Sequence, residues 1–423
     1  MTTGPRPSGV WHVGKRLARR VARRLSSDGA KTAGQVRGAF TREAVAALQA
    51  LPATQEPPLL LGFYPRFTTN PYQALLYSRV RDAGIVAVGI SRPEMIGELT
   101  ALQRAGQATV LHLHWLHLIL RDVTSAFEGE RAIAELLGLL DEYRDAGGST
   151  VWTVHNILPH EARDEALEAR LASEVARRAD VIHVLAEGTP DHVAPYFHLP
   201  PERLLHVPHP SYAGVYPDHV SASEARARLG LGPEEVVYLV LGGIRAYKGL
   251  PELLDAWISL PPDGARRLVI AGAPLDEPGI TALLERAAAL PNVLVDARKI
   301  PADEIQVFLR AADVAVLPYR RALNSGALML ALTFGVPVVV PSDGGLAEIV
   351  DPSFAVTFDS RHEDGLRDAL VEARRLLGPT AKAATLAAAA RYDPAELSRR
   401  FAEGLRERLA SRAATTEVRP PGD

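Results

Sequence analysis

The sequence predicts an α/β protein built from two parallel sheets, each covered by helices on both faces. Short apolar runs alternate along the chain with helical segments of ten or more residues, which is the pattern of parallel strands joined by helical crossovers. The alternation is interrupted between Pro208 and Glu235, where turn-forming residues cluster, and it then restarts. We therefore expect two doubly wound, Rossmann-like domains that face each other across a cleft.

The expected strands are the short apolar runs, five in the first half and six in the second. Those of the first half are LLLGFY (59–64), IVAVGI (85–90), ATVLHLHW (108–115), STVWTVHN (149–156) and ADVIHVLA (179–186). Those of the second half are VVYLVLGG (236–243), RRLVIAGAP (266–274), NVLVDARK (292–299), DVAVLPY (313–319), VPVVVPS (336–342) and FAVTFD (354–359). In the first half, helices are expected at 71–84, closed by Gly84, at 127–146 and at 161–179.

Turn residues and composition divide the chain into five parts. We expect a basic extension and linker (1–57), an N-terminal Rossmann-like domain (58–215), a C-terminal Rossmann-like domain (216–378), C-terminal helices (379–412) and a disordered tail (413–423). The last helix is expected to begin at Pro394, with Asp393 as its cap. This helix could pack back on the N-terminal domain.

The composition is that of an ordinary soluble globular protein, with 47% hydrophobic and 23% charged residues. The formal net charge of -3 gives no general attraction to nucleic acid, so we expect no nucleic-acid partner. The absence of cysteine excludes disulfides and thiolate metal sites. No apolar run reaches the roughly 20 residues that span a bilayer, and the N-terminus lacks the pattern of a secretory signal. The sequence therefore predicts a cytoplasmic protein.

An anion site is expected where the first strand of the second half turns into a helix, in VLGGIRAYKGLPELLDAW (240–257). Glycines allow the backbone to approach a ligand, Arg245 and Lys248 supply positive charge, and the helix start leaves N–H groups unpaired. The alternative is a glycine turn with two solvated cations.

A second anion site is expected at Asn324, Ser325 and Gly326, which open a helix after another strand. Asn324 or Ser325 would cap this helix, and Gly326 would leave its first turn open to a phosphate. Plain helix capping is the alternative. Because the carboxyl ends of parallel strands meet at one sheet edge, the two sites together favour a bound diphosphate.

The motifs of the second half resemble those of a known family. The succession IRAYKG, RLVIAGAP, ADVAVLPYR and NSGALMLALTFGVPVVVPSDGGLAEIV resembles the donor-binding half of GT-B glycosyltransferases, in the branch with bacterial exopolysaccharide and lipid-linked-sugar enzymes. The resemblance extends over roughly residues 58–410. It implies a metal-independent hexosyltransferase that moves a sugar from a UDP- or GDP-sugar to an acceptor hydroxyl, on a lipid-linked or polysaccharide acceptor. The N-terminal domain would bind the acceptor, and no cofactor is implied beyond the nucleotide-sugar substrate.

The resemblance also implies roles for single residues. Contacts with the donor diphosphate or sugar are implied for Gly243, Arg245, Lys248, Asn324, Ser325, Gly326 and Glu348, and Arg298 would border the nucleobase. Many members of the branch carry two glutamates eight positions apart, where this chain has Ala322 and Leu330. This departure keeps open a GT-B module that binds without catalysis, and an epimerase or phosphorylase of the same fold is a further alternative.

His155 is the expected catalytic residue, because it directly follows the strand STVWTV and would point into the crevice between the domains. Imidazole donates or accepts a proton near neutral pH, and Glu161 is a second candidate base. Asn156 could orient an acceptor hydroxyl. A structural histidine is the alternative at position 155.

Histidines also gather in LHLHWLH, where His112 and His114 alternate on one face of a strand and Trp115 and His117 follow. We interpret these four residues as an acceptor-sugar surface with Trp115 as a stacking platform. A metal site and buried or capping histidines are the alternatives, and no metal is expected because no carboxylate or thiolate stands nearby in the sequence.

The segment GKRLARRVARRLSS predicts a basic amphipathic helix over residues 15–25. Its apolar residues recur every four positions among six cations, which is typical of contact with an anionic membrane surface. A solvated or nucleic-acid-attracting tail is the alternative. Membrane association would suit a lipid-linked acceptor.

Overall fold

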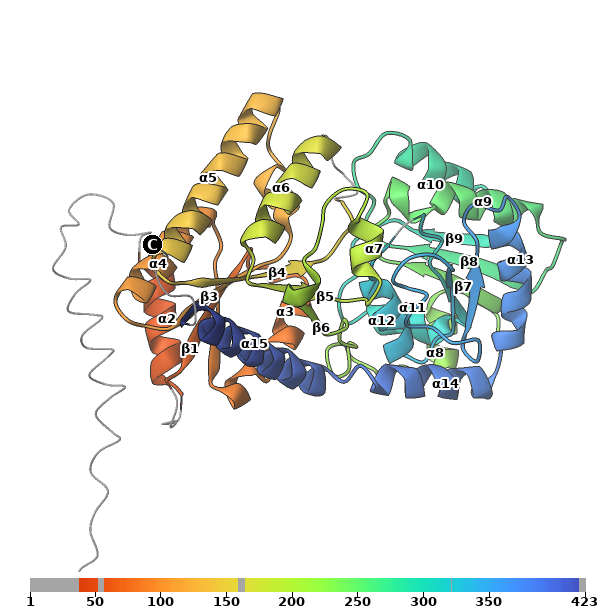
Figure 1. Cartoon of the computed structure of the whole chain (residues 1–423). Coiled ribbons are helices and arrows are strands. Elements are labelled where there is room, and N and C mark those ends of the chain that lie inside the picture. The colour runs from red at the N-terminus through yellow and green to blue at the C-terminus, as the bar shows by residue number, and fades with distance from the viewer. Residues whose placement is uncertain (1–37, 52–56, 159–163, 321, 418–423) are drawn as a thin grey trace, which may run out of the picture. The chain divides into compact units, whose positions relative to one another are not determined.

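The computed structural model describes residues 38–51, 57–158, 164–320 and 322–417, and the basic segment at 15–25 lies outside them. The chain forms two compact units. The first holds the described residues up to Val184, together with residues 193–207 and those from Ala395 onward. The second holds residues 185–192 and 208–394. Figure 1 shows both units with many of their helices and strands labelled.

The first unit is a parallel sheet of six strands in the order β2-β1-β3-β4-β5-β6. Its strands are β1 (Leu59–Tyr64), β2 (Ile85–Gly89), β3 (Thr109–Leu113), β4 (Ser149–Val154), β5 (Val181–Val184) and β6 (Leu204–His206). The first five confirm the strands expected from the sequence. The sixth was missed, because a run of three residues after a proline-rich turn carries too little pattern to be recognised.

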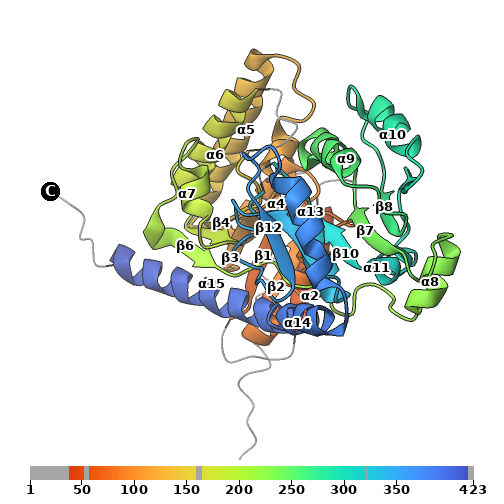
Figure 2. The ribbon, with the colours of Figure 1, turned by 90° about the vertical axis from the view of Figure 1, so that its right-hand side faces the viewer.

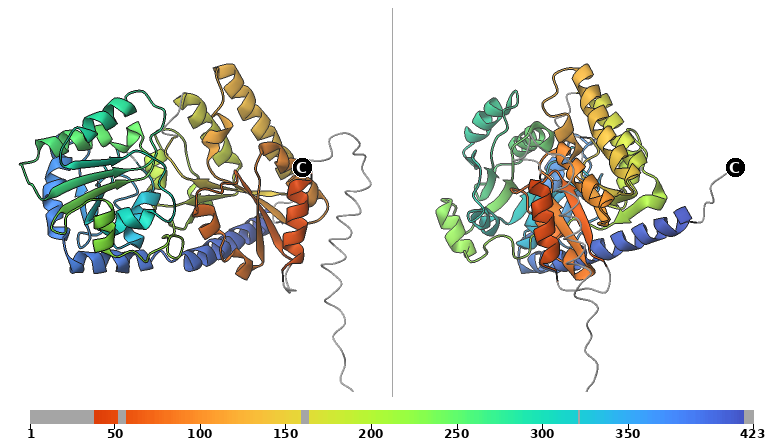
Figure 3. Two further views of the ribbon diagram at one scale, coloured as in Figure 1. Left: turned by 180° about the vertical axis from the view of Figure 1, so that it is seen from behind. Right: turned by 90° about the vertical axis from the view of Figure 1, so that its left-hand side faces the viewer.

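Helices cover both faces of this sheet. They are α2 (Ala39–Gln49), α3 (Tyr72–Leu76), η2 (Val80–Ala83), η3 (Pro93–Met95), α4 (Ile96–Arg104), η4 (Leu116–Ile119), α5 (Ala126–Asp145), α6 (Glu165–Arg178), η5 (Pro201–Arg203) and α15 (Pro394–Glu417). The short helix α7 (Thr189–Val193) contains the change from the second unit back to the first. Figures 1 and 3 show α5 and α6 side by side on one side of the first sheet and α15 on the other.

The expected helix at 71–84 is divided into two, because a serine of α15 forms hydrogen bonds with backbone groups that would otherwise continue the helix. Ser398 Oγ accepts a hydrogen bond from Arg79 N at 2.9 Å and donates one to Leu76 O at 2.7 Å. The helical stretch therefore stops after α3 and resumes as η2, which Gly84 closes in the left-handed conformation at φ 67°.

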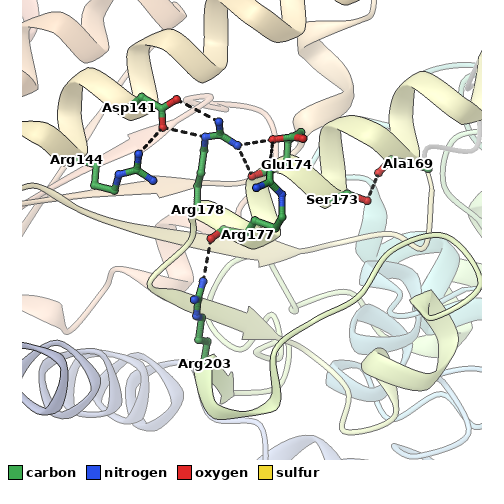
Figure 4. A network of polar contacts seen from close by, with 8 residues as sticks. All are labelled: Asp141, Arg144, Ala169, Ser173, Glu174, Arg177, Arg178 and Arg203. Carbon is green, nitrogen blue, oxygen red and sulfur yellow. Dashed lines mark hydrogen bonds and ion pairs between the residues drawn. The ribbon is translucent and has the colours of Figure 1, made fainter. Parts of the chain in front are cut away.

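An arginine on α6 fastens that helix to α5 (Figure 4). The guanidinium of Arg178 donates to both carboxylate oxygens of Asp141 at 3.0 and 3.1 Å, and it also pairs with Glu174. These bonds hold the pKa of the Asp141 carboxyl below its usual range. Arg203 donates to the Arg177 carbonyl at 3.0 Å and so ties the turn before β6 to the end of α6.

The second unit is a parallel sheet in the order β12-β11-β10-β7-β8-β9. Its strands are β7 (Val236–Leu241), β8 (Arg266–Ala271), β9 (Val293–Asp296), β10 (Val314–Val316), β11 (Val338–Pro341) and β12 (Ala355–Phe358), which confirms all six expected strands. Its helices are α8 (Ala222–Arg228), η6 (Ala246–Lys248), α9 (Leu250–Ser259), α10 (Ile280–Ala288), α11 (Ile305–Ala311), α12 (Gly326–Thr333), α13 (Gly365–Glu372), η7 (Ala373–Leu376) and α14 (Pro379–Ala390). Figure 2 shows α13 next to β12.

The strand order of each sheet reverses at one point, between β1 and β3 in the first sheet and between β7 and β10 in the second. In doubly wound sheets, ligands bind beyond the carboxyl ends of the strands at such a reversal. The fold class predicted from the sequence is thus confirmed, and it marks one candidate ligand site in each unit.

The core of the second unit is formed as the helical spacing predicts. In α9, Leu250, Leu253, Leu254 and Trp257 are all at most 3% exposed. Full burial of one such side chain contributes about 1.5 to 3 kcal/mol to folding. This burial fixes the direction of α9, and therefore the position of the turn that precedes it.

The C-terminal helix α15 begins at Pro394 and runs to Glu417, so it extends five residues beyond the expected boundary at 412. Two alanines and the absence of glycine or proline between Arg412 and Glu417 favour this extension of the helix. In the first unit, Phe401 of α15 is fully buried and its ring stacks on His112 at 5.3 Å between centroids.

Candidate functional site

The turn between β7 and α9 brings the helix start against the end of β10. Gly249, the residue before α9, has φ 70°, and a Cβ there would lie 1.7 Å from the carbonyl oxygen of Pro318. Only glycine allows both the conformation and this approach. The glycine turn expected in the sequence therefore lies at the reversal between β7 and β10.

Lys248, at the end of η6, is a half-buried cation at this reversal. Its Nζ lies 5.7 Å from the centroid of the Tyr319 ring and 3.4 Å from the Cβ position of Gly242. Within the described ranges, Lys248 has no hydrogen bond or ion pair through its ammonium group. Burial, and then the charge of Arg245, lower its pKa. A bound anion would offset this electrostatic cost, so the arrangement is compatible with the expected anion site, which stays a prediction.

Arg245 lies beside the same turn. Its Nε is 3.6 Å from the Cβ position of Gly243, so the side chain folds back over the glycine. The structure thus brings Gly243, Arg245 and Lys248 together, as the sequence analysis expected, and their contact with a diphosphate stays a prediction.

The N-terminus of α12 lies at the other side of Tyr319. Ser325 is the N-cap, since its Oγ accepts a hydrogen bond from Leu328 N at 3.2 Å. The same Oγ lies 3.4 Å from the Tyr319 hydroxyl. Tyr319 therefore connects the lysine to the helix start. The sequence analysis missed this tyrosine, although its place directly after a strand marks it as a residue of the ligand edge.

Gly326, the first residue of α12, lies against another tyrosine that the sequence analysis missed. A Cβ at Gly326 would be 2.7 Å from the Tyr212 hydroxyl. Tyr212 is buried, and burial raises its pKa well above the usual value. The glycine thus makes room for a neutral hydroxyl over the first turn of the helix. Tyr212 stands in a turn-rich segment, where no strand end marks it.

Two residues expected at the donor site already bind protein groups. The carboxylate of Glu348 accepts hydrogen bonds from the backbone N–H of Glu187 at 2.7 Å and of Gly188 at 2.9 Å. Arg298 pairs with Asp296 at 2.9 Å and with Glu304. The structure does not bring these two residues into contact with the Lys248 turn, and their roles at the ribose and nucleobase stay predictions. Asn324 precedes the cap and is half-buried.

In the first unit, His155 directly follows β4 and is 7% exposed. Its ring stacks on Trp115 with centroids 4.1 Å apart and an interplanar angle of 14°. The edge of Tyr72 contacts it from α3, at 5.0 Å between centroids. His155 thus lies at the carboxyl edge of the first sheet, where the sequence analysis expected it.

A small cavity of about 40 Å³ adjoins this histidine. It is lined by His114, Trp115, Leu116, His117, Trp152, His155, Asn156, Ile157, Leu158, Glu168, Ala172 and Phe197. The cavity therefore collects four of the five expected acceptor-side residues, namely His114, Trp115, His117 and Asn156. Glu161, the second candidate base, lies outside the described residues, as does His160.

His112 does not belong to such a surface, and the expectation that it faces an acceptor is corrected. The side chain is fully buried beneath Phe401, and its ring nitrogens bond to Tyr77 at 2.8 Å and Thr153 at 2.7 Å. His114 is 1% exposed and bonds to Tyr77 and His155. Burial lowers the pKa of both imidazoles well below the usual value, so both are neutral.

Glu168 is a cavity residue that the sequence analysis missed. It lies in the first turn of α6, where the helix dipole favours acidic residues. Its position in the sequence therefore gives no sign of a role in the cavity. The side chain is buried, and its carboxyl has no hydrogen bond or ion pair among the residues that the structure describes. Burial, and then the charge of Asp164, raise the pKa of Glu168 to about 7. The cavity thus holds a carboxyl that titrates near neutral pH.

Neither a metal cluster nor a membrane span is present in the described part of the chain. No group of three or more His, Asp or Glu side chains there is arranged to hold a metal ion. No helix there combines the length and the apolar character needed to cross a bilayer.

Residues 235–375 match the family model described as glycosyl transferases group 1. The chain is 29% identical over 316 residues to a GDP-mannose:glycolipid 4-beta-D-mannosyltransferase of Xanthomonas campestris pv. campestris, covering 73% of this chain and 81% of the relative. It is 32% identical over 175 residues to a D-inositol 3-phosphate glycosyltransferase of Segniliparus rotundus, covering 40% of this chain and 38% of the relative.

Among solved structures, the chain is similar to HepE of Anabaena in complex with UDP and glucose. The TM-score is 0.58 at 15% identity, over 83% of this chain and 100% of that one. At this identity the likeness concerns the fold alone. The segment that matches the family model contains the Lys248 turn and the start of α12.

Proposed function

We propose that the chain is a nucleotide-sugar-dependent glycosyltransferase of group 1 with the GT-B fold, and that it transfers a mannosyl residue from GDP-mannose to a hydroxyl of a glycolipid. The observation that carries the donor part is the ammonium of Lys248, which is unpaired within the described residues and lies over Tyr319, whose hydroxyl is 3.4 Å from the N-cap of α12. A fixed cation and a helix N-terminus at one sheet reversal fit the two phosphates of a nucleoside diphosphate.

The choice of guanine and mannose rests on the relatives. The Xanthomonas campestris mannosyltransferase, which by its name uses GDP-mannose and a glycolipid, matches over 73% of this chain. The UDP-bound Anabaena structure has only 15% identity and therefore does not favour UDP. A GDP-sugar is accordingly the proposed donor and a glycolipid the proposed acceptor.

The proposed reaction is a direct displacement at the anomeric carbon. An oxygen of the acceptor hydroxyl forms the new glycosidic bond, while the bond from the anomeric carbon to the diphosphate breaks and its electron pair goes to the phosphate oxygen. Lys248, with Arg245 and the α12 N-terminus, stabilises the growing negative charge on this leaving group.

The proton of the acceptor hydroxyl goes to His155 in this scheme. A base on the acceptor is what displacement with inversion requires, and a buried imidazole stacked on Trp115 fits the task. Asn156 and Glu168 line the same cavity and would bind the hydroxyls of the acceptor sugar.

The donor part is tested by thermal unfolding of the full chain with GDP, UDP, GDP-mannose and UDP-glucose. A ligand present at a hundred times its dissociation constant stabilises the folded state by about 2.7 kcal/mol. We expect GDP and GDP-mannose to raise the melting temperature more than the uridine compounds do. The absence of stabilisation by any of the four would favour a GT-B module that binds without catalysis.

The catalytic part is tested with His155→Gln and release of GDP from GDP-mannose in the presence of a lipid extract containing glycolipids. We expect turnover to fall at least about a hundredfold, in line with the loss of a general base. Donor binding by the same thermal assay should be unchanged. The matched control is His362→Gln, which changes an exposed histidine of the second unit. Equal turnover of the two variants would contradict the role of His155.

A further inference from the structure

A continuous line of hydrogen bonds crosses the interior of the first unit and ends at His155. We call its six side chains the histidine chain: Tyr77, His112, His114, Thr153, His155 and His183. They come from the segment after α3, from strands β3, β4 and β5, and from the residues that follow β3 and β4. The proposed reaction uses only His155, so the other five polar side chains need an explanation of their own.

The inner end of the histidine chain has a fixed direction. His183 Nε2 lies 2.8 Å from the carbonyl oxygen of Val207, which can only accept, so Nε2 carries the proton. Because full burial disfavours the charged form of this imidazole, the other ring nitrogen accepts, and it does so from the Thr153 hydroxyl at 2.9 Å. Because the hydroxyl proton is used, Thr153 Oγ1 accepts from His112 Nε2 at 2.7 Å.

The direction continues without a break to the surface of the cavity. His112 Nδ1 accepts from the Tyr77 hydroxyl at 2.8 Å, and the Tyr77 oxygen accepts from His114 Nε2 at 2.6 Å. His114 Nδ1 is therefore without a proton and accepts from His155 Nε2 at 3.0 Å. A single carbonyl oxygen at one end thus determines the tautomer of four histidines.

We propose that the histidine chain holds His155 as the tautomer protonated on Nε2, so that Nδ1 carries the lone pair that takes the proton of the acceptor hydroxyl. Its five inner members act as positioning residues: Tyr77, His112, His114, Thr153 and His183. This inference rests on the proposed role of His155 as the base. An imidazole in the opposite tautomer would present N–H at Nδ1 and could not accept that proton.

The histidine chain also keeps the transferred proton on His155. Burial disfavours the charged form of His112 and His114, whose pKa values it lowers, so the imidazolium remains at the outer end. The line cannot release a proton at its inner end, because a backbone carbonyl has none to pass on. When His155 becomes charged, its Nε2–H still donates to His114, and no other bond has to change.

Among the residues that the structure describes, the titratable groups that face His155 come from four segments. They are Tyr72 from α3, His114 from the end of β3, where it directly follows the strand, His117 from η4 and Glu168 from α6. Glu168 titrates in the same range as an ordinary imidazole, so a pH profile alone does not identify the base. The experiment must therefore measure the tautomer itself.

The test is nitrogen NMR of the full chain with labelled histidine, without substrate, near pH 8. The resonances of His155 are identified by their absence in His155→Gln. We expect Nε2 to be protonated and Nδ1 bare in the unchanged protein. In Tyr77→Phe and Thr153→Val, each of which removes one hydroxyl from the line, we expect both tautomers of His155. Thr153→Ser keeps the hydroxyl and should restore the single tautomer.

The kinetic readout is turnover against the Michaelis constant for GDP-mannose. Tyr77→Phe and Thr153→Val should lower kcat roughly 10- to 100-fold, as is typical when the hydrogen-bond partner that orients a functional histidine is lost. The Michaelis constant should stay near its original value. The matched control is Tyr143→Phe, because Tyr143 is a buried tyrosine of the same unit whose hydroxyl bonds to Thr109 at 2.7 Å.

A proton on Nδ1 of His155 in the unchanged protein would overturn the inference. An unchanged single tautomer in both Tyr77→Phe and Thr153→Val would do the same. Thermal unfolding of these variants beside Tyr143→Phe shows whether each remains folded at the temperature of the NMR measurement. The NMR measurement needs no substrate, so its outcome does not depend on the proposed reaction. If His155→Gln remains active, the proposed role of His155 as the base fails. The inference that the line of bonds fixes the tautomer of His155 can still be supported in that case.

Discussion

The ammonium nitrogen of Lys248 lies 5.7 Å from the centre of the Tyr319 ring, over a ring whose hydroxyl is within 3.4 Å of Ser325. The lysine ends the turn after β7, and the serine caps the helix after β10. One aromatic side chain thus joins the two features of the second unit that are proposed to bind the diphosphate. The attraction of the ring holds the cation while no protein carboxylate neutralises it in the described residues.

We expect Lys248→Met to weaken catalysis strongly while the protein stays folded. Methionine keeps much of the apolar stem but removes the charge, so the loss should be about 2 to 4 kcal/mol of transition-state stabilisation, as for other preorganised charge donors. The measurement is kcat/KM with GDP-mannose. Lys382→Met on the exposed surface of α14 is the matched control. Near-normal kcat/KM in Lys248→Met would show that the diphosphate does not bind at this turn.

We expect Gly326→Ala to disturb the start of α12 through Tyr212. The new Cβ would lie 2.7 Å from the tyrosine hydroxyl, closer than carbon and oxygen atoms tolerate, so the ring or the helix must shift. Overpacking of this kind typically costs about 1 to 3 kcal/mol of folding stability. The measurement is the free energy of unfolding in urea.

The control for this prediction is the double variant Gly326→Ala with Tyr212→Phe. Removing the hydroxyl leaves the nearest ring carbon 3.7 Å from the new Cβ, which is ordinary contact. We expect the double variant to recover most of the stability that Gly326→Ala loses relative to Tyr212→Phe alone. If Gly326→Ala lowers the free energy of unfolding as much in the Tyr212→Phe background as in the native background, the clash is not with the Tyr212 hydroxyl.

The fold was predictable because parallel strands buried on both faces leave continuous apolar runs, and eleven of the twelve strands carry one. The interruption of the helix expected at 71–84 was not predictable, because it depends on Ser398, a residue near the far end of the chain. The same helix α15 explains why His112 was misread. Its alternation with His114 is visible in the sequence, but the ring of Phe401 that buries it is not.

The turn at Lys248 and the capped start of α12 were predictable because glycine and capping patterns are local, and their binding of an anion stays a prediction. The line of bonds through Tyr77 and Thr153 was not predictable, since a lone tyrosine and threonine have no sequence signature, and neither does the burial of Glu168. Such contacts form only when several strands align their side chains on one face of a sheet.

The basic segment at 15–25 lies outside the described residues, and its contact with an anionic surface stays a prediction. We expect the full chain to co-sediment with vesicles containing anionic lipid and not with neutral ones. Each cation near an anionic leaflet contributes about 1 kcal/mol. Replacement of all six cations by glutamine should therefore abolish this binding: Lys15, Arg16, Arg19, Arg20, Arg23 and Arg24. Equal sedimentation of the two proteins would remove the membrane role.

Glu168 should make the stability of the protein depend on pH between about 4.5 and 7. Its pKa is raised to about 7 in the folded state from 4.5, mainly because burial disfavours the carboxylate. The folded state therefore binds the proton more tightly than the unfolded state. The stability that the neutral carboxyl contributes is fully present below pH 4.5, and it is lost as pH rises through 7.

We therefore expect Glu168→Gln, which is neutral at every pH, to gain stability relative to the unchanged protein as pH rises. The difference should grow by up to about 3 kcal/mol from pH 4.5 to pH 8, because one pKa unit corresponds to about 1.4 kcal/mol. The measurement is the free energy of unfolding in urea at both pH values. Glu165→Gln, in the same turn of α6 but exposed, is the matched control and should show no such growth. If the difference between Glu168→Gln and the unchanged protein does not vary with pH, the carboxyl is ionised in the folded state, and the cavity beside His155 holds a fixed negative charge instead of a neutral acid.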